Sequence, residues 1–586
     1  MPLSPVVHVN GSALAEHWLA ALLDVRVERE FQIPSRCTLR FTDPGYVLTA
    51  AAEVHLGTTI TVSVEEEGGP ASELVHTEVT SIAVDQREGE QPELVVVAHD
   101  KSHRMGRGTQ IKSYTSMTYS DIVARIVQSH GMTPVVDATS ETFDYVLQTD
   151  SDQGFVTELA RRTGYDWWVD GSRFHFVRPK SSATVRLELG QELRSFSVRA
   201  SGHHPDKVKV DGWDRDQQLL VVGPSAASNP QIHSKSEFAS IIDSASGAYA
   251  ESTLFTAGLA AASVGEADQL AQALFDRGVA SAMTVRGVTD GDARIVPGVT
   301  VDVSSAGPLS GTYPITKVEH VHRPRTGFVT RFQSGDRRPT SLVDSLGRGS
   351  RPLLAEQKSG VYAAEVTNIN DPENRGRIKV RFPGVSDAEE SAWARLVAVG
   401  GGTERGNVFI PEVKDQVLVA FETGDPRQPV VIGGLHDAKA KIPQTEIVGG
   451  KVQVRGMTSR LGHVVMLYDG EDPSQQAIGL VLAGKEHMIR LGKDKLDIEV
   501  PEGVPINVKA GATSIAISDE GDMKLQAAGK ITIQSEEKIS LLAPKVEITG
   551  DNGFDVMAED VSVSGNSVSV SGGDSVSIKA AMVAIN

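Results

Sequence analysis

The last 90 residues carry an apolar-x-apolar motif that recurs every seven to nine residues, and this repeat restricts the possible folds more than any other feature. Each dyad places two side chains on one face of a short strand, and polar corner residues separate it from the next dyad. Self-similarity at a nearly fixed period predicts a repeat architecture. The eleven dyads are Ile506/Val508, Ile515/Ile517, Met523/Leu525, Ile531/Ile533, Ile539/Leu541, Val546/Ile548, Phe554/Val556, Val561/Val563, Val568/Val570, Val576/Ile578 and Val583/Ile585.

Consecutive dyads have similar sizes and show no longer superperiod, so one chain has no pattern for the several faces of a closed coil. Three chains that wind together could each supply one face of a triangular prism, and their strands would pair along the axis at about 4.8 Å. We therefore predict an intertwined trimeric β-helix or prism. A single-chain β-solenoid and a disordered Ser/Gly tail are the alternatives. The predicted trimer core contains Ile531, Ile533, Ile539, Leu541, Val546 and Ile548.

Composition excludes several classes of protein. The net charge of −19 argues against nucleic acid as a partner, because phosphate binding favours a basic surface. The single cysteine, Cys37, allows neither an internal disulfide nor a Cys-based zinc site. No apolar run approaches the roughly 20 residues of a membrane helix, and the first residues lack the basic region of a secretory signal. We expect synthesis and assembly in the cytoplasm.

Residues 1–345 are predicted to be α+β and mostly β. Short alternating stretches such as 37–41 and 60–64 are typical of half-buried strands. Two helices are expected, one capped by Ser120 and one ending at Gly164, and a third helix over 266–277. Asp170-Gly171 between aromatic strands predicts a type I′ hairpin.

Linkers divide the remaining chain into two parts. Residues 346–360 and 438–450 are rich in polar residues and Gly or Pro, which favours linkers. Between them, 361–437 alternates over short strands and has the size of a small closed barrel of the OB type. Residues 451–586 hold the dyad repeat and are called the needle below, and 1–345 is called the hub.

Motifs for catalysis, cofactors or metals are not found in the sequence. Residues 479–485 fit GxxxxGK, but Glu486 replaces the Ser or Thr that a P-loop needs for magnesium. His320 and His322 share a strand face, yet no carboxylate stands at matching spacing, so a structural role is expected. We therefore predict no catalytic, cofactor-binding or metal-binding residue.

Several stretches together resemble the VgrG and phage late-control hub family. In the hub these are 147–171 and the Gly212-Trp213-Asp214 element. More specific are "VTNINDPENRGRIKVRFP" at 366–383 and "RGNVFIPEVKDQVLVAFETGDPRQPVVIGGL" at 405–435, which resemble the OB-like spike base of that family. The resemblance covers nearly the whole chain. One departure is Gly384, where the family often has tryptophan.

The resemblance implies a homotrimeric spike at the front of a contractile injection machine. Two similar barrels per chain would adapt the hub to a hexameric inner tube, with the OB domains and the needle below. The implied partners are the inner tube, baseplate proteins, a PAAR-like tip protein, cargo effectors and the target membrane on firing. Extracellular phage-tail-like systems are the nearest match, and a type VI secretion VgrG is the alternative.

Enzymatic and metal-binding extras of the family are expected to be absent. The gap between Leu435 and Lys451 has no room for a lysozyme domain, and residues 580–586 contain no histidine for an iron site. A cell-wall hydrolase and a receptor-binding fibre are the rival classes. At the end of the needle we predict a platform for a cap protein, because the last strand layer would otherwise leave an open apolar edge. Its residues are Ala580, Met582, Val583, Ile585 and Asn586.

Overall fold

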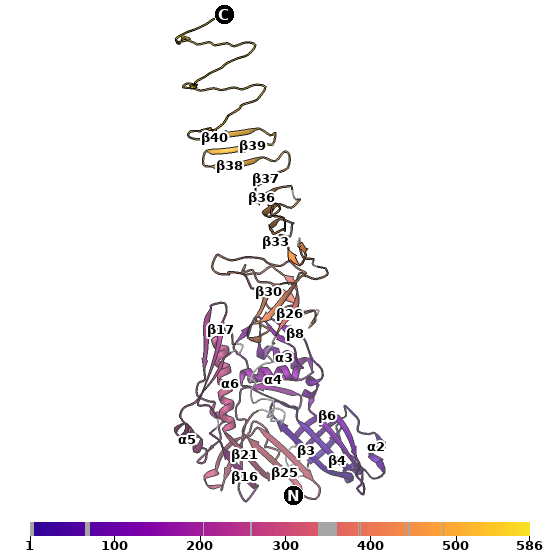
Figure 1. The fold of residues 1–586 in the computed structure, drawn as a ribbon. Helices are drawn as coiled ribbons and strands as arrows, with labels where there is room; N and C mark the ends of the chain where they lie inside the picture. The colour runs from indigo at the N-terminus through magenta and orange to yellow at the C-terminus, as the bar shows by residue number, and fades with distance from the viewer. Residues whose placement is uncertain are drawn as a thin grey trace. The chain divides into compact units, whose positions relative to one another are not determined.

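The computed structural model describes residues 5–64, 71–202, 204–257, 261–337, 360–384, 386, 388–439, 441–443, 446–484 and 486–585 (Figure 1). Strands hold 39% of the chain and helices 14%, so the prediction of a mostly β protein is confirmed. The chain divides into two compact units, residues 1–441 and 442–586. Most of the predicted linker 346–360 lies outside the described residues.

An eleven-stranded sheet organises the hub and joins strands from both of its ends in sequence. It is antiparallel throughout, and its centre is the pairing of β24 with β3. In sheet order its strands are β16 (Leu193–Ala200), β21 (Met283–Asp290), β25 (Gly327–Ser334), β24 (Lys317–Arg323), β3 (Leu22–Glu30), β4 (Arg36–Thr42), β7 (Glu93–His99), β6 (Ser72–Asp85), β5 (Thr59–Val64), β1 (Pro5–Val9) and β2 (Ser12–Ala13).

The sheet contains the same four-stranded unit twice. The order β16-β21-β25-β24 repeats the order β3-β4-β7-β6. A β-bulge falls between Leu22 and Asp24 in β3, and an equivalent bulge falls between Leu193 and Ser195 in β16. Bulges re-aim a strand and are specific features rather than defects. The two barrel-like domains are thus copies of one design joined in a single sheet.

A turn common to both copies supports this equivalence. Gly57 and Gly298 adopt left-handed φ angles of 86° and 94°, which glycine tolerates without strain. Each donates its N–H to a more distant carbonyl, Gly57 to that of Val79 in β6 (2.8 Å) and Gly298 to that of Ile315, directly after β23 (2.9 Å). Each copy also has its own apolar core, one around Phe41 and one around Phe332.

The second copy is completed by a four-stranded sheet in the order β15 (Thr184–Glu188), β22 (Thr300–Ser304), β23 (Gly311–Pro314) and β19 (Lys235–Ser236). A three-stranded sheet has the order β18 (Leu219–Pro224), β17 (Lys207–Asp214) and β20 (Thr253–Ala257), and α6 (Val264–Ala282) packs on it. The third predicted helix therefore exists but is longer than 266–277. The sequence did not predict α1 (Glu16–Ala21), α2 (Val47–Ala51) or α5 (Ser240–Tyr249).

A helical subdomain lies between the two copies in sequence and contains α3 (Tyr119–Ser129) and α4 (Asp152–Thr163). The predicted cap Ser120 is wrong, because Thr118 caps α3 in a reciprocal capping box with Asp121. Gly164 ends α4 in the left-handed conformation, as predicted. The short strands here are β8 (Lys112–Tyr114), β9 (Met117–Thr118), β10 (Thr133–Val136), β11 (Thr142–Phe143), β12 (Val146–Gln148), β13 (Asp166–Asp170) and β14 (Arg173–Val177).

The predicted aromatic hairpin forms between β13 and β14, but its turn is shifted by one residue. Asp170 pairs with Arg173, so the loop is Gly171-Ser172. Of these two only Gly171 has a positive φ (57°), whereas a type I′ turn needs two such residues. The type I′ prediction is therefore wrong, and the pattern is that of a type II′ turn.

Residues 361–434 form a five-stranded sheet around one apolar core that includes Val366, Val380 and Val419. A buried ion pair between Arg377 and Asp371 (2.7 Å) fixes the loop before the second strand. The strand order is β27 (Lys379–Arg381), β26 (Val361–Asn368), β29 (Gln416–Phe421), β30 (Pro429–Gly434) and β28 (Arg395–Leu396). In the described residues the 3₁₀ helices are η1 (Pro44–Tyr46), η2 (Lys101–Gly106), η3 (Pro230–Ile232), η4 (Gly307–Leu309) and η5 (Glu422–Gly424).

The second unit contains three separate antiparallel sheets, β31-β32, β33 to β37 and β38 to β40, and within each sheet consecutive strands pair. Beyond Gln526 the described residues contain no strand. The strands are β31 (Ile447–Val448), β32 (Lys451–Val452), β33 (Val454–Thr458), β34 (Val464–Tyr468), β35 (Ala477–Val481), β36 (Met488–Gly492), β37 (Leu496–Glu499), β38 (Ile506–Ala510), β39 (Thr513–Ile517) and β40 (Met523–Gln526).

Candidate functional site

The first three dyads lie opposite one another on β38, β39 and β40. Val508 faces Ile515, and Ile515 in turn faces Leu525. The repeat predicts that every needle strand pairs with a neighbouring chain, and for 506–526 that prediction is wrong. The reason is the corner, where Gly511 (φ 61°) reverses the chain within two residues and returns it to its own strand.

The remaining eight dyads have no strand partner among the described residues 527–585. Here the chain runs in zigzags that are spaced more widely than β38–β40 (Figure 1). A single-chain β-solenoid would hydrogen-bond each run to the next coil of the same chain, and this pairing is not present in 527–585. The runs therefore present unpaired backbone donors and acceptors along most of their length.

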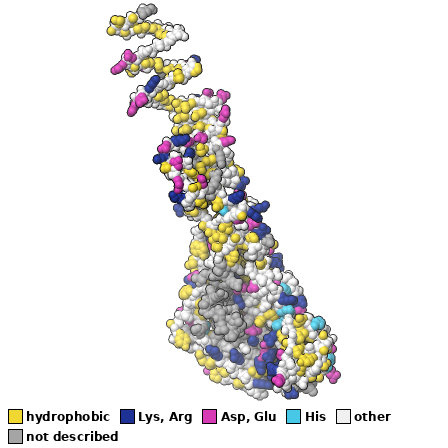
Figure 2. Space-filling view, turned by 45° about the vertical axis from the view of Figure 1, so that its right-hand side comes forward, with side chains coloured by type: hydrophobic (Ala, Val, Ile, Leu, Met, Phe, Trp, Pro, Cys, Tyr) yellow, Lys and Arg dark blue, Asp and Glu magenta, His cyan; other side chains and the backbone are white. Residues whose placement is uncertain are grey.

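The side chains predicted for the trimer core are exposed in the isolated chain. Ile531 is 52% exposed and Ile533 is 68% exposed, and the other four predicted residues, Ile539, Leu541, Val546 and Ile548, behave alike. Figure 2 shows hydrophobic side chains along these runs at the C-terminal end. An exposed ladder of apolar pairs with unpaired strands is a surface for association.

The predicted tip residues are also exposed. Met582 is 84% exposed and Ile585 is 89% exposed, with Val583 half-exposed and Ala580 exposed. Asn586 lies outside the described residues. The residue between the two members of the last dyad is Ala584, whereas in the seven dyads before it that residue is Thr, Ser, Glu or Asp. The last run is therefore apolar on both faces.

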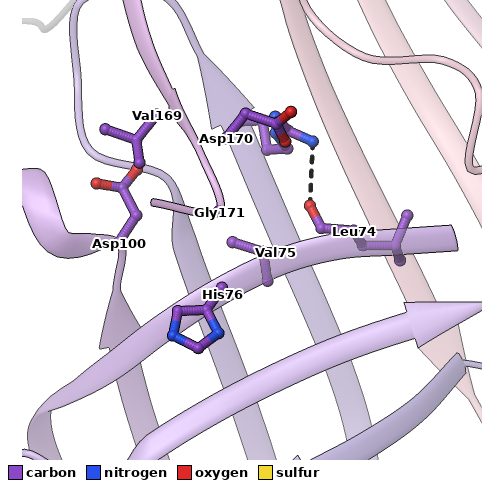
Figure 3. A pocket seen from close by; sticks show the side chains of 8 residues that line it. Leu74, Val75, His76, Asp100, Val169, Asp170 and Gly171 are labelled. Atoms are coloured by element: carbon purple, nitrogen blue, oxygen red, sulfur yellow. Dashed lines mark hydrogen bonds and ion pairs between the residues drawn. The ribbon is translucent and has the colours of Figure 1, made fainter. Parts of the chain in front are cut away.

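A small cavity in the hub brings several charged residues together (Figure 3). Arg29 donates from Nη1 to the carbonyl of Leu74 (3.1 Å), and its Nη2 lies 3.5 Å from Oδ1 of Asp170. Burial lowers the pKa of Arg29, and the carboxylates of Asp170 and Asp100 oppose that shift. The cavity holds about 10 Å³, room for one water rather than a substrate.

Asp100 lines the same cavity and is held by two backbone N–H groups, one from the loop between β3 and β4 and one from its own loop. Its carboxylate accepts from the N–H of Ser35 (2.5 Å) and from the N–H of Ser102 (2.9 Å). Burial raises the pKa of Asp100, and these hydrogen bonds oppose the rise. Both charged groups are thus occupied in holding the strands and loops together.

A wider groove of about 620 Å³ opens beside β3 and η2. Two ion pairs lie along it: Arg36 with Glu28 (3.3 Å) and Lys317 with Glu30 (2.9 Å). Arg29 and Arg107 also line the groove, so cations outnumber the two carboxylates there.

The surroundings of the two histidines of β24 indicate a structural role rather than metal binding. His320 is buried, and its Nδ1 lies 3.0 Å from the hydroxyl of Thr330. Burial lowers the pKa of His320 to about 3 and also lowers the pKa of His322. No group of three metal-ligating side chains occurs in the described part of the chain. Likewise, no helix in that part is long and apolar enough to cross a membrane.

A buried ion network that the sequence did not reveal joins residues 361–434 to the hub. Arg427 lies 3.0 Å from Glu266 of α6 and 2.9 Å from Asp425, and its guanidinium covers the ring of Phe143. Arg162 of α4 lies 3.5 Å from the same glutamate. Burial alone would lower the pKa of Arg427, but Glu266 and the other acidic groups around it raise it overall.

Two domain families match this chain. Residues 362–436 match the Type VI secretion system/phage-baseplate injector OB domain. Residues 6–323, more than half of the chain, match the Alg8 N-terminal domain.

Curated relatives are similar over a short stretch. The type VI secretion system spike protein VgrG5 of Pseudomonas aeruginosa is 34% identical over 104 residues, which is 16% of this chain and 13% of that protein. VgrG3 of Vibrio cholerae is 33% identical over 102 residues, which is 16% of this chain and 10% of that protein. The chain thus spans a tenth to an eighth of the length of these relatives.

Among solved structures, a chain of the half-lidded Francisella PdpA-VgrG complex has a TM-score of 0.49 and 8% identity, covering 85% of this chain and 88% of that one. The E. coli c3393 protein, described as a component of the type VI secretion system, has a TM-score of 0.46 and 16% identity. That match covers 74% of this chain and 100% of the E. coli chain.

Proposed function

The chain belongs to the family of the Alg8 N-terminal domain, and on that premise we propose that it is the structural, membrane-puncturing spike of a contractile injection particle. The observation that carries the proposal is the exposed dyad ladder of 527–585, which has apolar pairs and unpaired backbone groups but no strand partner among the residues that the structure describes. The injector OB domain at 362–436 supports the same function.

The proposed spike is a homotrimer divided as the sequence predicts: hub 1–345, OB base 361–437 and needle 451–586. Three needles wound together bury the dyads on a common axis and pair the open strands. The Arg427–Glu266 network supports a rigid connection between the hub and the OB base, because it buries a charge from each.

Sedimentation of the full chain tests this assembly directly. The expected result is a mass of three chains, independent of dilution over the micromolar range. A folded monomer over the same range contradicts the proposal.

The proposed partners follow from the position of each part. The hub would join the inner tube and baseplate, and the tip residues Ala580, Met582, Val583 and Ile585 would bind a PAAR-like cap, with cargo carried on the spike to the target membrane. Assembly would take place in the bacterial cytoplasm as part of a phage-tail-like particle, either released from the cell or retained as a type VI machine. Deleting 580–586 is expected to abolish capture of a co-expressed PAAR-like protein while the trimer mass stays unchanged. Capture by the truncated chain would show that the cap binds elsewhere.

We further propose that the chain acts without catalysis. The support is that several charged groups of the described cavities are held by ion pairs and hydrogen bonds within the hub, as for Arg36 with Glu28. Incubation of the purified protein with peptidoglycan should release no muropeptides. Sustained release that scales with protein concentration would favour the rival hydrolase.

A further inference from the structure

The groove beside β3 and η2 has a lining whose charge is opposite to that of the chain as a whole. Four cationic side chains and two carboxylates line it, whereas the whole chain has a net charge of −19. The cations are Arg29, Arg36, Arg107 and Lys317, and the carboxylates are those of Glu28 and Glu30. A cleft lined by one sign of charge concentrates the electric field and attracts ions of the other sign. The groove therefore favours an anionic ligand.

Two of these arginines have guanidinium nitrogens that are not used inside the chain. Both contacts of Arg36 are made by Nε, which donates to the hydroxyl of Thr38 (3.2 Å) and lies 3.3 Å from the carboxylate of Glu28. Its two terminal nitrogens make no hydrogen bond within the described residues, and neither does the side chain of Arg107. A guanidinium presents its N–H groups in a planar fork that matches a carboxylate. Both arginines can therefore bind a carboxylate from outside the chain.

The cations are spread across neighbouring strands of the hub sheet. Lys317 of β24 lies opposite Glu30 of β3, and on the other side of β3 Glu28 lies opposite Arg36 of β4. Lys317 and Arg36 are thus two strands apart and offset by two residues, which places their backbones about 12 Å apart. An extended peptide covers that distance in about four residues. A single small anion lies over only one of the two positions.

An apolar wall lies beside the cations. Ile33 is 40% exposed and is followed by Pro34, and both line the groove. The loop that presents them is anchored by Gln32, which has a left-handed φ of 62° and donates its N–H to the carbonyl of Trp167 (2.8 Å). The isoleucine is therefore held at the surface by a fixed backbone. Covering it with an apolar side chain of a ligand removes apolar area from water, which is favourable.

We propose that the groove beside β3 and η2 binds an acidic peptide segment of another protein in an extended conformation. Its carboxylates contact the unused nitrogens of Arg36 and Arg107 and the amine of Lys317. An apolar side chain of the same peptide packs on Ile33. The volume of about 620 Å³ suits a short peptide, because ligand pockets span roughly 300–1,000 Å³. The inference goes beyond the proposed spike and does not depend on it, since all of these residues belong to one chain.

His99 can report on an anion in this groove. Its Nδ1 lies 2.7 Å from the hydroxyl of Thr80, and it lies opposite Arg36 in the pairing of β7 with β4. Burial lowers the pKa of His99, and the positive charges of His103 and Arg36 lower it further. A carboxylate bound at Arg36 offsets that charge, so binding should raise the pKa of His99.

Fluorescence anisotropy with the full chain tests the site. The probe is a short fluorescein-labelled peptide with two glutamates about four positions apart, the span from Lys317 to Arg36, and leucines between them. The matched control peptide has glutamine in place of both glutamates. The acidic peptide should bind with one site per chain, and the control should bind at least about tenfold more weakly, because hydrogen bonds to charged groups are the stronger ones.

Substitutions assign the binding to the groove. Arg36→Gln and Arg107→Gln should each weaken binding of the acidic peptide about threefold, and the double variant about tenfold. Arg186→Gln is the matched control, because Arg186 of β15 is 90% exposed and lies outside the groove, and it should bind as the unmodified chain does. Thermal unfolding should be the same in all of these variants. Histidine NMR, with His99→Gln to assign the resonance, should show the pKa of His99 rising when the acidic peptide is bound.

The outcomes separate this inference from the proposed function. Equal binding of the two peptides, or an unchanged affinity in the double variant, would overturn the peptide site. Displacement of the probe by an equal concentration of inorganic phosphate would assign the groove to a compact anion and would also overturn it. A trimer that does not bind the acidic peptide keeps the proposed spike and loses the peptide site. A monomer that binds the peptide keeps the site and contradicts the spike.

Discussion

Residues 506–526 and 527–585 carry the same dyad motif, yet only the first segment pairs with itself. The difference lies in the corners between dyads. Corners of the first segment contain left-handed glycines, Gly511 (φ 61°) and Gly521 (φ 88°), which reverse the chain tightly. Among the described residues of the second segment only Gly553 has a positive φ. Both segments carry the dyads, so the corners determine whether a run pairs with the next run of the same chain.

The same contrast separates the two units. All five apolar cores lie within residues 1–441 and are closed by a single chain. In 527–585 every dyad side chain is at least 50% exposed. We therefore expect the stability of the first unit to be independent of protein concentration, and the order of the second unit to depend on association.

The largest effect on assembly is expected from a substitution in the predicted trimer core of the needle. Ile531→Asp would place three unpaired charges on the prism axis and should abolish needle assembly, because each buried charge without a partner costs several kcal/mol. Sedimentation of the variant should give monomers. Thr532→Asp, on the opposite strand face, is the matched control and should remain trimeric. Equal loss of assembly in both variants would contradict the assignment of faces.

The next largest effect is expected from the buried ion network of Arg427. The loss of stability should be confined to the first unit. Arg427→Met removes the nearer of the two arginines that contact buried Glu266 and leaves only Arg162 at 3.5 Å, so it should lower the free energy of unfolding by about 3 kcal/mol. Thermal unfolding followed by tryptophan fluorescence reports on this unit, since all five tryptophans lie at or before residue 393. Arg375→Met removes an exposed ion pair with Asp216 and should change stability by less than about 1 kcal/mol.

Acid is expected to lower the stability of the first unit because of His320. Its folded pKa of about 3 lies below the ordinary value of 6.5, so the neutral form is favoured by folding. This contribution to the free energy of unfolding is fully present above pH 6.5 and is lost as pH falls toward 3. The loss amounts to about 2 kcal/mol at pH 5. His320→Gln should flatten the pH dependence of hub unfolding between pH 7 and pH 5. An unchanged slope in the variant would assign the titration to another group.

The smallest effect concerns the corners themselves. Gly511→Ala should cost about 1 kcal/mol in the β38–β39 hairpin, because a Cβ is disfavoured at a φ of 61°. Gly529→Ala is the matched control, since Gly529 has no positive φ and nothing within 4 Å of the added Cβ. Hydrogen exchange over 506–517 should accelerate in the first variant and stay unchanged in the second.

The sequence by itself determined the features that depend on local pattern. Alternation located β4 and β5, Gly164 marked the end of α4, and the period of the dyads marked the needle. Residues 361–437 were assigned to an OB barrel from their strands and a resemblance, and the family match at 362–436 agrees with that fold. These features can be predicted from the sequence because they depend on residues only a few positions apart.

Only the tertiary structure decided the features that depend on distant residues. Thr118 rather than Ser120 caps α3 because Asp121 returns a hydrogen bond to it. Glu266 and Arg427 lie 161 positions apart, and no spacing rule pairs them. The joining of two copies through β24 and β3 required strands nearly 300 residues apart to meet in register. Local pattern fixes which face of a strand is apolar, but strand partners are chosen by which edges remain unpaired when the whole sheet has formed.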